Sequence, residues 1–202
     1  MALEVKQIPV GPMSNLVYLA VDTTTRDAVV VDSGWETGPI EKAVAESGAR
    51  VKYIVATHGH FDHVSTMEEL AGKVGGKLVA HESSGARYDL KVRDGDLLEV
   101  GRAALRIIHT PGHTEDSICV YGGREVFTGD TLFVGTIGRF DRERAGAMYS
   151  SLHDVIFRLP PETVLYPGHD YGEVRSRTLR EERESNPYLG ARDVGEFTSA
   201  FA

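Results

Sequence analysis

The sequence predicts an α/β fold built in layers, and three observations indicate it. Short runs of apolar, β-branched residues recur along the chain, such as DAVVVD at 27–32 and VKYIVA at 51–56. Segments with the 3.6-residue spacing of helices lie between several of these runs. Polar side chains with metal-ligand chemistry follow several of the runs directly. Interleaved strands and helices favour sheets covered by helices, and 202 residues suit one domain, here expected over 1–202.

The elements of the first half can be justified in order. The turn signal Gly11-Pro12 separates two strand patterns. After the strand at 27–32, Ile40 and Val44 share a helical face, and Gly48 is a stop signal. A second helix pattern follows the strand at 51–56. We expect strands over 3–9, 16–21, 27–32, 51–56 and 77–80, and helices over 37–47 and around 67–74.

The second half is richer in strands until its last quarter. Gly122-Gly123 separates two apolar runs and predicts a hairpin, and Pro160-Pro161 ends a long helical pattern. A final charged segment leads to Asn186-Pro187 and is expected to be a short helical tail over about 173–202. We expect strands over 96–100, 103–108, 117–121, 125–128 and 163–166, and helices over 145–159 and 173–184.

Composition excludes several classes of function. The net charge of −8, from 22 basic and 30 acidic residues, argues against nucleic acid or an anionic membrane as the main partner. The single cysteine, Cys119, excludes an internal disulfide, and its apolar neighbours in SICVY predict a buried side chain. The start MALEVKQIPV lacks the pattern of a signal peptide, and no apolar run approaches the length of a membrane span. We expect a cytoplasmic protein.

The segment THGHFDHVS at 57–65 predicts a metal site. His58, His60, Asp62 and His63 offer imidazole and carboxylate ligands, which suit zinc, iron and manganese. The segment follows a predicted buried strand directly, and the carboxyl ends of strands are where sites form in layered α/β proteins. A polar loop that happens to contain histidines is the less favoured interpretation.

Neighbouring side chains diverge, so further ligands must come from elsewhere in the chain. Three residues share one context: His113 in TPGHT, Asp130 in FTGD and His169 in YPGHD each follow a predicted strand and a glycine. Glycine permits sharp turns and close approach of the backbone. This repeated context predicts that the three side chains join the cluster at 58–63.

This ordered pattern resembles the metallo-β-lactamase superfamily. The motifs span residues 32–169, and VDSG at 31–34 resembles the superfamily's first motif, in which the aspartate, here Asp32, supports the metal site. The resemblance implies an αβ/βα four-layer sandwich of two mixed sheets flanked by helices. It also implies two divalent metal ions. Zinc is the first expectation for their identity, and iron and manganese are the alternatives. One ion would be held by His58, His60 and His113, the other by Asp62, His63 and His169, with Asp130 and a hydroxide between them.

Two branches of the superfamily are similar to this chain. GDTLFVGTIGR at 129–139 and NPYL at 186–189 resemble glyoxalase II, which implies a thioester hydrolase of the hydroxyacylglutathione type using a metal-bound hydroxide. VRDGDLLEVG at 92–101 and YPGHDYG at 166–172 resemble the persulfide dioxygenases. In that branch a single Fe(II) would be held by His58, His113 and Asp130. Hydrolysis is our first expectation and sulfur oxygenation the alternative.

The resemblance has departures that bear on the substrate. HVST at 63–66 lacks the Gly-Gly often found there in glyoxalase II, and 33 residues after His169 are too few for the large glutathione-binding domain of long glyoxalases II. We expect a small thioester or thiol, with glutathione-derived compounds among the candidates, and either a monomer or a homodimer. Arg139 and Tyr171 are the candidate substrate-binding residues, with Asp62 as the candidate catalytic residue that orients the hydroxide. One arginine of the charged segment, among Arg175, Arg177, Arg180 and Arg183, is a further candidate.

Two other functions are less favoured by the residues. A structural zinc site usually has four ligands, often thiolates, which seven nitrogen and oxygen ligands without cysteine do not match. A nuclease of the same superfamily is disfavoured by the net charge of −8.

Overall fold

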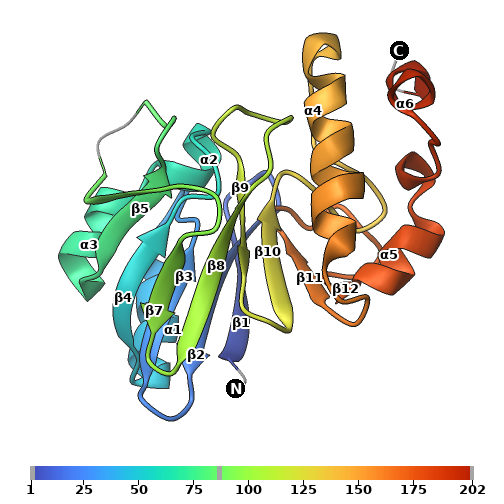
Figure 1. The fold of residues 1–202 in the computed structure, drawn as a ribbon. Helices are drawn as coiled ribbons and strands as arrows, with labels where there is room; N and C mark the ends of the chain where they lie inside the picture. Colours follow the sequence, from blue (N-terminus) through green and yellow to red (C-terminus); the bar gives the residue numbers. More distant parts are fainter. Residues whose placement is uncertain (1–2, 86–87, 201–202) are drawn as a thin grey trace.

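Two sheets lie face to face, and helices cover their outer faces, as the ribbon of the computed structural model shows (Figure 1). The structure describes residues 3–85 and 88–200. Each sheet has six strands among these residues, so the predicted four-layer α/β sandwich is confirmed. No helix within the described ranges is both long enough and apolar enough to cross a membrane.

The first sheet has the strand order β1-β2-β3-β4-β5-β6. β1 to β3 form an antiparallel meander, whereas β3, β4, β5 and β6 run parallel. Parallel pairs require crossovers, and α1 supplies the one between β3 and β4, whereas α2 and α3 supply the one between β4 and β5. The bounds are β1 Leu3–Val10, β2 Asn15–Asp22, β3 Asp27–Val31, α1 Gly38–Ser47, β4 Arg50–Val55, α2 Phe61–Val64, α3 Met67–Val74, β5 Lys77–His81 and β6 Leu90–Val92.

The second sheet has the order β12-β11-β10-β9-β8-β7. Its strands pair antiparallel except for β10 and β11, which run parallel with the long helical segment between them. The bounds are β7 Leu97–Val100, β8 Ala103–His109, β9 Ile118–Tyr121, β10 Glu125–Gly129, α4 Ala145–Ser150, β11 Val164–Pro167, β12 Arg177–Thr178, α5 Leu179–Ser185 and α6 Val194–Ala200. Shorter turns of helix occupy Arg142–Arg144, Ser151–Val155, Ile156–Arg158 and Pro187–Leu189.

Three apolar layers hold the sandwich together. One lies between the first sheet and its helices and contains Ile40 and Leu70. The central layer joins the sheets, where the Tyr18 ring lies 5.2 Å from that of Phe127. The third packs α4 and the C-terminal helices on the second sheet and includes Phe197. Fully buried aromatic and aliphatic side chains each contribute about 1.5–3 kcal/mol, which makes the sheets a rigid support for loops at their edges.

The strands and the helices at 37–47 and 145–159 were predicted within a few residues, but one helix prediction was wrong. Residues 172–176 are irregular, Arg177–Thr178 forms a strand, and α5 begins only at Leu179. Thr178 and Glu181 form a capping box, which satisfies backbone donors at that position and fixes the helix start there. β6 and β12 were not predicted, since each is short and its pattern is weak, whereas α6 falls within the expected helical tail.

The two sheets meet through backbone hydrogen bonds at the edge where several strands end. The amide of Leu16 donates to the carbonyl of Gly168 at 2.9 Å, and the amide of Ile118 donates to Thr57 at 2.8 Å. An isolated bridge also pairs Asn15 with His169. These contacts bring the loops after β3, β4, β8, β10 and β11 to one place.

Candidate metal centre

The segment after β4 places four ligand-type side chains within six residues, 58–63. His58 follows the buried end of β4, and the single helical turn α2 carries Asp62 and His63. His58 and His63 are buried, whereas His60 is exposed. The backbone amide of Ser33 donates to the carbonyl of His63 at 2.8 Å, which ties this turn to the loop after β3.

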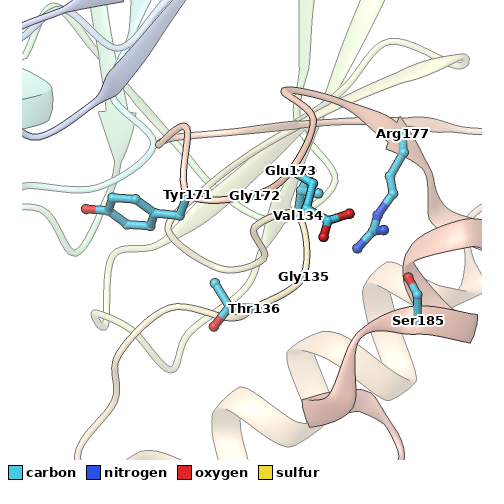
Figure 2. Close-up of a pocket in the computed structure, with 8 residues that line it drawn as sticks. All are labelled: Val134, Gly135, Thr136, Tyr171, Gly172, Glu173, Arg177 and Ser185. Atoms are coloured by element: carbon cyan, nitrogen blue, oxygen red, sulfur yellow. The ribbon is translucent and has the colours of Figure 1, made fainter.

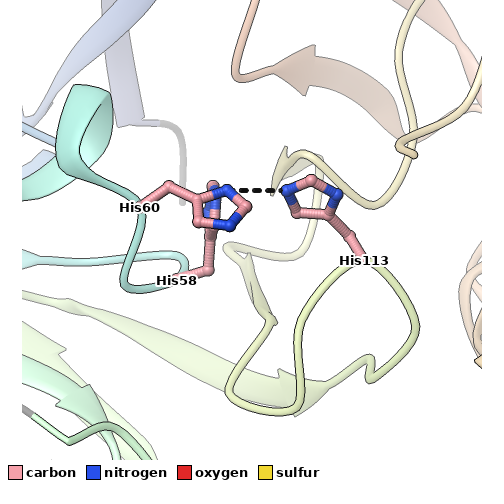
Figure 3. A group of neighbouring side chains, drawn as sticks. All are labelled: His58, His60 and His113. Atoms are coloured by element: carbon pink, nitrogen blue, oxygen red, sulfur yellow. Dashed lines mark hydrogen bonds between the residues drawn. The ribbon is translucent and has the colours of Figure 1, made fainter. Parts of the chain in front are cut away.

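His58, His60 and His113 form the first group of converging ligands (Figure 3). Nδ1 of His60 lies 3.0 Å from Nε2 of His58 and 3.0 Å from Nε2 of His113. Three ring nitrogens at such mutual distances surround a common point. The predicted grouping of these residues is therefore present in the structure.

Asp62, His63 and His169 form the second group. Oδ2 of Asp62 lies 3.4 Å from Nε2 of His63 and 3.4 Å from Nε2 of His169. The two Nε2 atoms are 3.2 Å apart. All three residues were predicted to lie together from the sequence.

Asp130 lies between the two groups. Its Oδ1 is 3.3 Å from Nε2 of His63, and its Oδ2 is 3.4 Å from Nε2 of His169 and 3.6 Å from Nε2 of His113. Oδ1 is buried and has no hydrogen-bond partner among the described residues. A buried carboxylate oxygen without a partner is costly unless a cation approaches it.

Hydrogen bonds on the outer side of three rings set their tautomers. Nδ1 of His63 donates to Oδ2 of Asp32 at 2.9 Å, Nδ1 of His113 to the Arg139 carbonyl at 2.7 Å, and Nδ1 of His169 to the Met13 carbonyl at 2.9 Å. In the neutral rings each Nε2 therefore presents a lone pair to the centre.

The facing lone pairs fit a cation. Without a cation, one of the two rings must take up a second proton for the Nε2 atoms of His63 and His169 to lie 3.2 Å apart without repulsion. Neutral imidazoles whose other nitrogen donates to a carboxylate or a carbonyl are the usual metal-binding arrangement. The donor set, nitrogen and oxygen without sulfur, suits zinc, iron or manganese.

The electrostatics of the cluster is dominated by burial and by its carboxylates. Burial alone lowers the pKa of His63, but the charge and hydrogen bond of Asp32, followed by Asp130 and Asp62, raise it to about 9. Burial would raise the pKa of Asp130, yet a hydrogen bond with His169 and the neighbouring histidines hold it well below its ordinary value. The site is a concentrated negative potential that attracts a cation.

Glycine allows the ligand loops to approach one another. A Cβ on Gly168 would lie 2.5 Å from Oδ1 of Asp130 and 2.9 Å from Cε1 of His63. A Cβ on Gly138 would lie 1.6 Å from the carbonyl oxygen of Asp130. This close packing explains why a residue without a side chain, Gly168, precedes His169.

Two supporting residues were missed in the sequence. Asn15 donates from Nδ2 to Oδ2 of Asp62 at 2.9 Å, and its Oδ1 accepts a hydrogen bond from Nε1 of Trp35 at 2.7 Å. Asn15 comes from a segment without a local metal-site pattern, and Trp35 directly follows the VDSG motif at 31–34. Asp32, by contrast, was expected to support the site, and its Oδ2 accepts a hydrogen bond from Nδ1 of His63 at 2.9 Å.

The centre opens into a pocket of about 410 Å³. Arg139 and Tyr171, the predicted substrate-binding residues, both line it, together with Phe133 and Thr136. The Tyr171 ring stacks on the ring of His169 with a centroid distance of 4.7 Å. Burial, followed by Asp130 and Asp62, raises the pKa of Tyr171, so its hydroxyl is a hydrogen-bond donor at neutral pH.

A sandwich of two mixed sheets with two such groups of ligand-type side chains at one edge defines a class of metal-dependent enzymes. The family model of the metallo-beta-lactamase superfamily matches residues 10–169, and the chain belongs to that superfamily.

Relatives with two different activities resemble the chain. It is 38% identical to the human mitochondrial persulfide dioxygenase ETHE1 over 85% of this chain and 70% of that protein. It is 35% identical to a hydroxyacylglutathione hydrolase of Cereibacter sphaeroides over 99% of this chain and 79% of that protein. The crystal structure of ETHE1 from Myxococcus xanthus superposes with a TM-score of 0.90 at 34% identity, covering 97% of this chain and 88% of that one.

Proposed function

We propose that the protein is a thioester hydrolase of the hydroxyacylglutathione type that uses two divalent metal ions, with zinc as the preferred metal. The observation that carries this proposal is the pair of groups, His58, His60 and His113 beside Asp62, His63 and His169. Asp130 lies between the groups and would contact both ions. Divalent ions bound there supply Lewis acidity and lower the pKa of a coordinated water from about 15.7 to roughly 7.

The side chains around the ions orient the reactants. Asp62 lines the pocket, and Asn15 fixes its carboxylate through two hydrogen bonds, to Oδ2 and to its backbone carbonyl. In this role Asp62 accepts a hydrogen bond from the attacking water and directs it at the thioester carbonyl. Phe133 and Ile137 line the same pocket and limit the access of other water.

Arg139 and Tyr171 are proposed to hold the substrate. Arg139 is exposed and lines the pocket, so it can pair with a carboxylate in bidentate fashion. Tyr171 can donate its hydroxyl proton to a substrate carbonyl. The similarity to the hydroxyacylglutathione hydrolase of Cereibacter sphaeroides supports a glutathione-derived thioester.

A second candidate function is favoured by the similarity to the ETHE1 proteins. In it, a single Fe(II) held by His58, His113 and Asp130 would support oxidation of glutathione persulfide. Two histidines and one carboxylate leave adjacent positions open for O₂ and a sulfur ligand. The same side chains are present for both functions, so the inventory of ligands does not separate them.

Metal analysis of anaerobically purified protein, joined to two assays, separates the candidates. Close to two zinc ions per chain, with turnover of S-lactoylglutathione, is the expected result. One iron per chain, with O₂ consumption on glutathione persulfide and no thioester cleavage, would replace the first proposal by the second. Absence of both activities in metal-loaded protein would reject both.

Four alanine variants refine this comparison. His58→Ala and Asp130→Ala should abolish activity and lower metal content under either function. His63→Ala and His169→Ala should be equally severe if two ions act together. Near wild-type turnover of either of the last two with one bound iron would contradict the hydrolase proposal.

A further inference from the structure

The ring of His58 is buried, and its outer nitrogen contacts a hydroxyl group. The inner nitrogen, Nε2, faces the first ligand group and lies 3.0 Å from Nδ1 of His60. The outer nitrogen, Nδ1, lies 3.2 Å from Oγ1 of Thr57, a residue that is 1% exposed. The hydrogen bond made at one ring nitrogen decides which nitrogen carries the proton, so Thr57 is in position to set the tautomer of His58.

The direction of this hydrogen bond follows from Asp32. Oγ1 of Thr57 lies 3.0 Å from Oδ2 of Asp32, and an ionised carboxylate only accepts hydrogen bonds. The single hydroxyl proton of Thr57 therefore goes to Asp32, and the lone pairs of Oγ1 remain for the proton on Nδ1 of His58. Nε2 of His58 is then unprotonated and presents its lone pair to the centre.

The opposite assignment does not suit a metal ligand. If the Thr57 hydroxyl donated to Nδ1 of His58, the proton of the neutral ring would lie on Nε2 and point at His60. The buried carboxylate of Asp32 would also lose one of its donors, which is costly for a charged group.

Through Thr57, one carboxylate holds a ring in each ligand group. Oδ2 of Asp32 accepts directly from Nδ1 of His63 at 2.9 Å, and it orients His58 through the Thr57 hydroxyl. His58 belongs to the first group of ligands and His63 to the second. Hydrogen bonds in a buried chain polarise one another, so loss of the hydroxyl should be felt at His58.

The side chain of Thr57 is fixed from both sheets. Its amide donates to Oδ1 of Asp32 at 2.8 Å, and its carbonyl accepts from the Ile118 amide at 2.8 Å. The backbone of Gly129 packs so closely that a Cβ there would lie 2.3 Å from Oγ1 of Thr57. The hydroxyl is therefore held where it meets Asp32 and His58.

Thr57 lies on the closed side of the metal centre. The open side is the pocket lined by Arg139, which shares Thr136 and Tyr171 with a second hollow of about 350 Å³ (Figure 2). Thr57 lines neither space. A substitution of Thr57 therefore acts on the metal ligands and not on a substrate in these spaces.

We propose that Thr57 is a positioning residue whose hydroxyl extends the hold of Asp32 from the second ligand group to His58 in the first. The inference rests on the metal centre of the proposed function, and it applies to both candidate reactions because His58 would bind metal in each. It gives the hydroxyl of Thr57, rather than the bulk of the side chain, a selective effect on the ion of the first group.

Zinc affinity, measured by competition with a chelator, tests this selectivity without turnover. Thr57→Val would be made in two backgrounds: His169→Ala, which leaves the first ligand group complete, and His60→Ala, which leaves the second complete. We expect binding to weaken about tenfold to a hundredfold in the first background, as for a residue that orients a ligand, and less than about threefold in the second. Thr57→Ser keeps the hydroxyl and should restore the affinity.

Thr163→Val is the matched control. Thr163 is also 1% exposed, and its hydroxyl has no hydrogen-bond partner among the described residues. The control removes the same group and should leave zinc affinity unchanged in both backgrounds. Equal weakening by Thr57→Val in the two backgrounds, no weakening in the first, or the same loss in Thr163→Val would overturn the proposal.

The tautomer of His58 gives a second readout that needs no variant. In zinc-loaded wild type, nitrogen-15 spectra of the histidine rings should place the His58 proton on Nδ1 and show its slow exchange with water. Zinc on Nδ1, or a proton on Nε2, would contradict the inference. Binding of one zinc ion instead of two would reject the two-metal reaction, whereas the position of this proton would still decide the role of Thr57.

Discussion

Nδ1 of His63 donates a hydrogen bond of 2.9 Å to Oδ2 of Asp32, and both side chains are buried. Asp32 is held in turn by Thr57, whose amide and hydroxyl donate to Oδ1 and Oδ2 at 2.8 and 3.0 Å. The backbone of Asp32 has a φ of 61°, which turns the chain sharply after β3. This contact joins the first sheet to one ring of the second ligand group.

Asp32→Asn should therefore lower metal affinity by about tenfold to a hundredfold, as expected for a residue that orients a ligand. Asparagine tolerates a positive φ, so the backbone is preserved, but its amide would meet the proton on Nδ1 of His63. Competition with a chelator measures the affinity. Asp154→Asn is the control, because this side chain is exposed in the helical turn Ser151–Val155. It should leave metal affinity unchanged. Unaltered affinity in Asp32→Asn would show that this hydrogen bond does not support the site.

Gly168→Ala should disrupt the centre sterically. The added methyl group would lie 2.5 Å from Oδ1 of Asp130, and overpacking of this kind typically costs about 1–3 kcal/mol of folding free energy. We expect at least a tenfold loss of metal affinity and a lower urea midpoint. Gly72→Ala has open space around its Cβ in α3 and should be neutral or stabilising. Similar behaviour of the two variants would contradict the steric argument.

The ligand-type residues could be predicted because each follows a strand, and strand ends gather at an edge of a layered sheet. Asn15 could not, since its contact with Asp62 depends on the bridge that pairs residue 15 with residue 169 across the two sheets. Such a long-range pairing leaves no mark on the local sequence.

In the C-terminal segment, the sequence-based prediction failed for a different reason. Its charged residues suggested one helix over 173–184, whereas α5 starts at Leu179. The signal for this start, TLRE at 178–181, is a capping box and was present in the sequence. The charge pattern did not reveal that Glu182 is fully buried, because burial of a carboxylate depends on partners from distant loops.

Cys119 should be unreactive in the folded protein. It is fully buried, and burial raises its pKa to about 12. The neutral thiol therefore contributes stability that is fully present below the unfolded pKa of about 8.5 and is lost as the pH rises through 12. A thiol reagent at pH 8.5 should label the protein only in denaturing urea. Rapid labelling of the native protein would contradict the assigned burial.

Asn15→Asp should impair catalysis more than folding. The substitution is isosteric but replaces the donor to Asp62 by a second carboxylate, 2.9 Å from Oδ2 in the present geometry. Loss of a hydrogen bond to a charged group costs about 1.5–3 kcal/mol, so kcat/KM should fall by roughly tenfold to a hundredfold. Trp35→Phe provides the matched comparison, because it removes the indole donor to Asn15 but leaves the contact between Asn15 and Asp62 intact. We expect less than a threefold loss for Trp35→Phe, and both variants should be assayed at saturating metal. If the two lost activity equally, orientation of Asp62 by Asn15 would not be the cause.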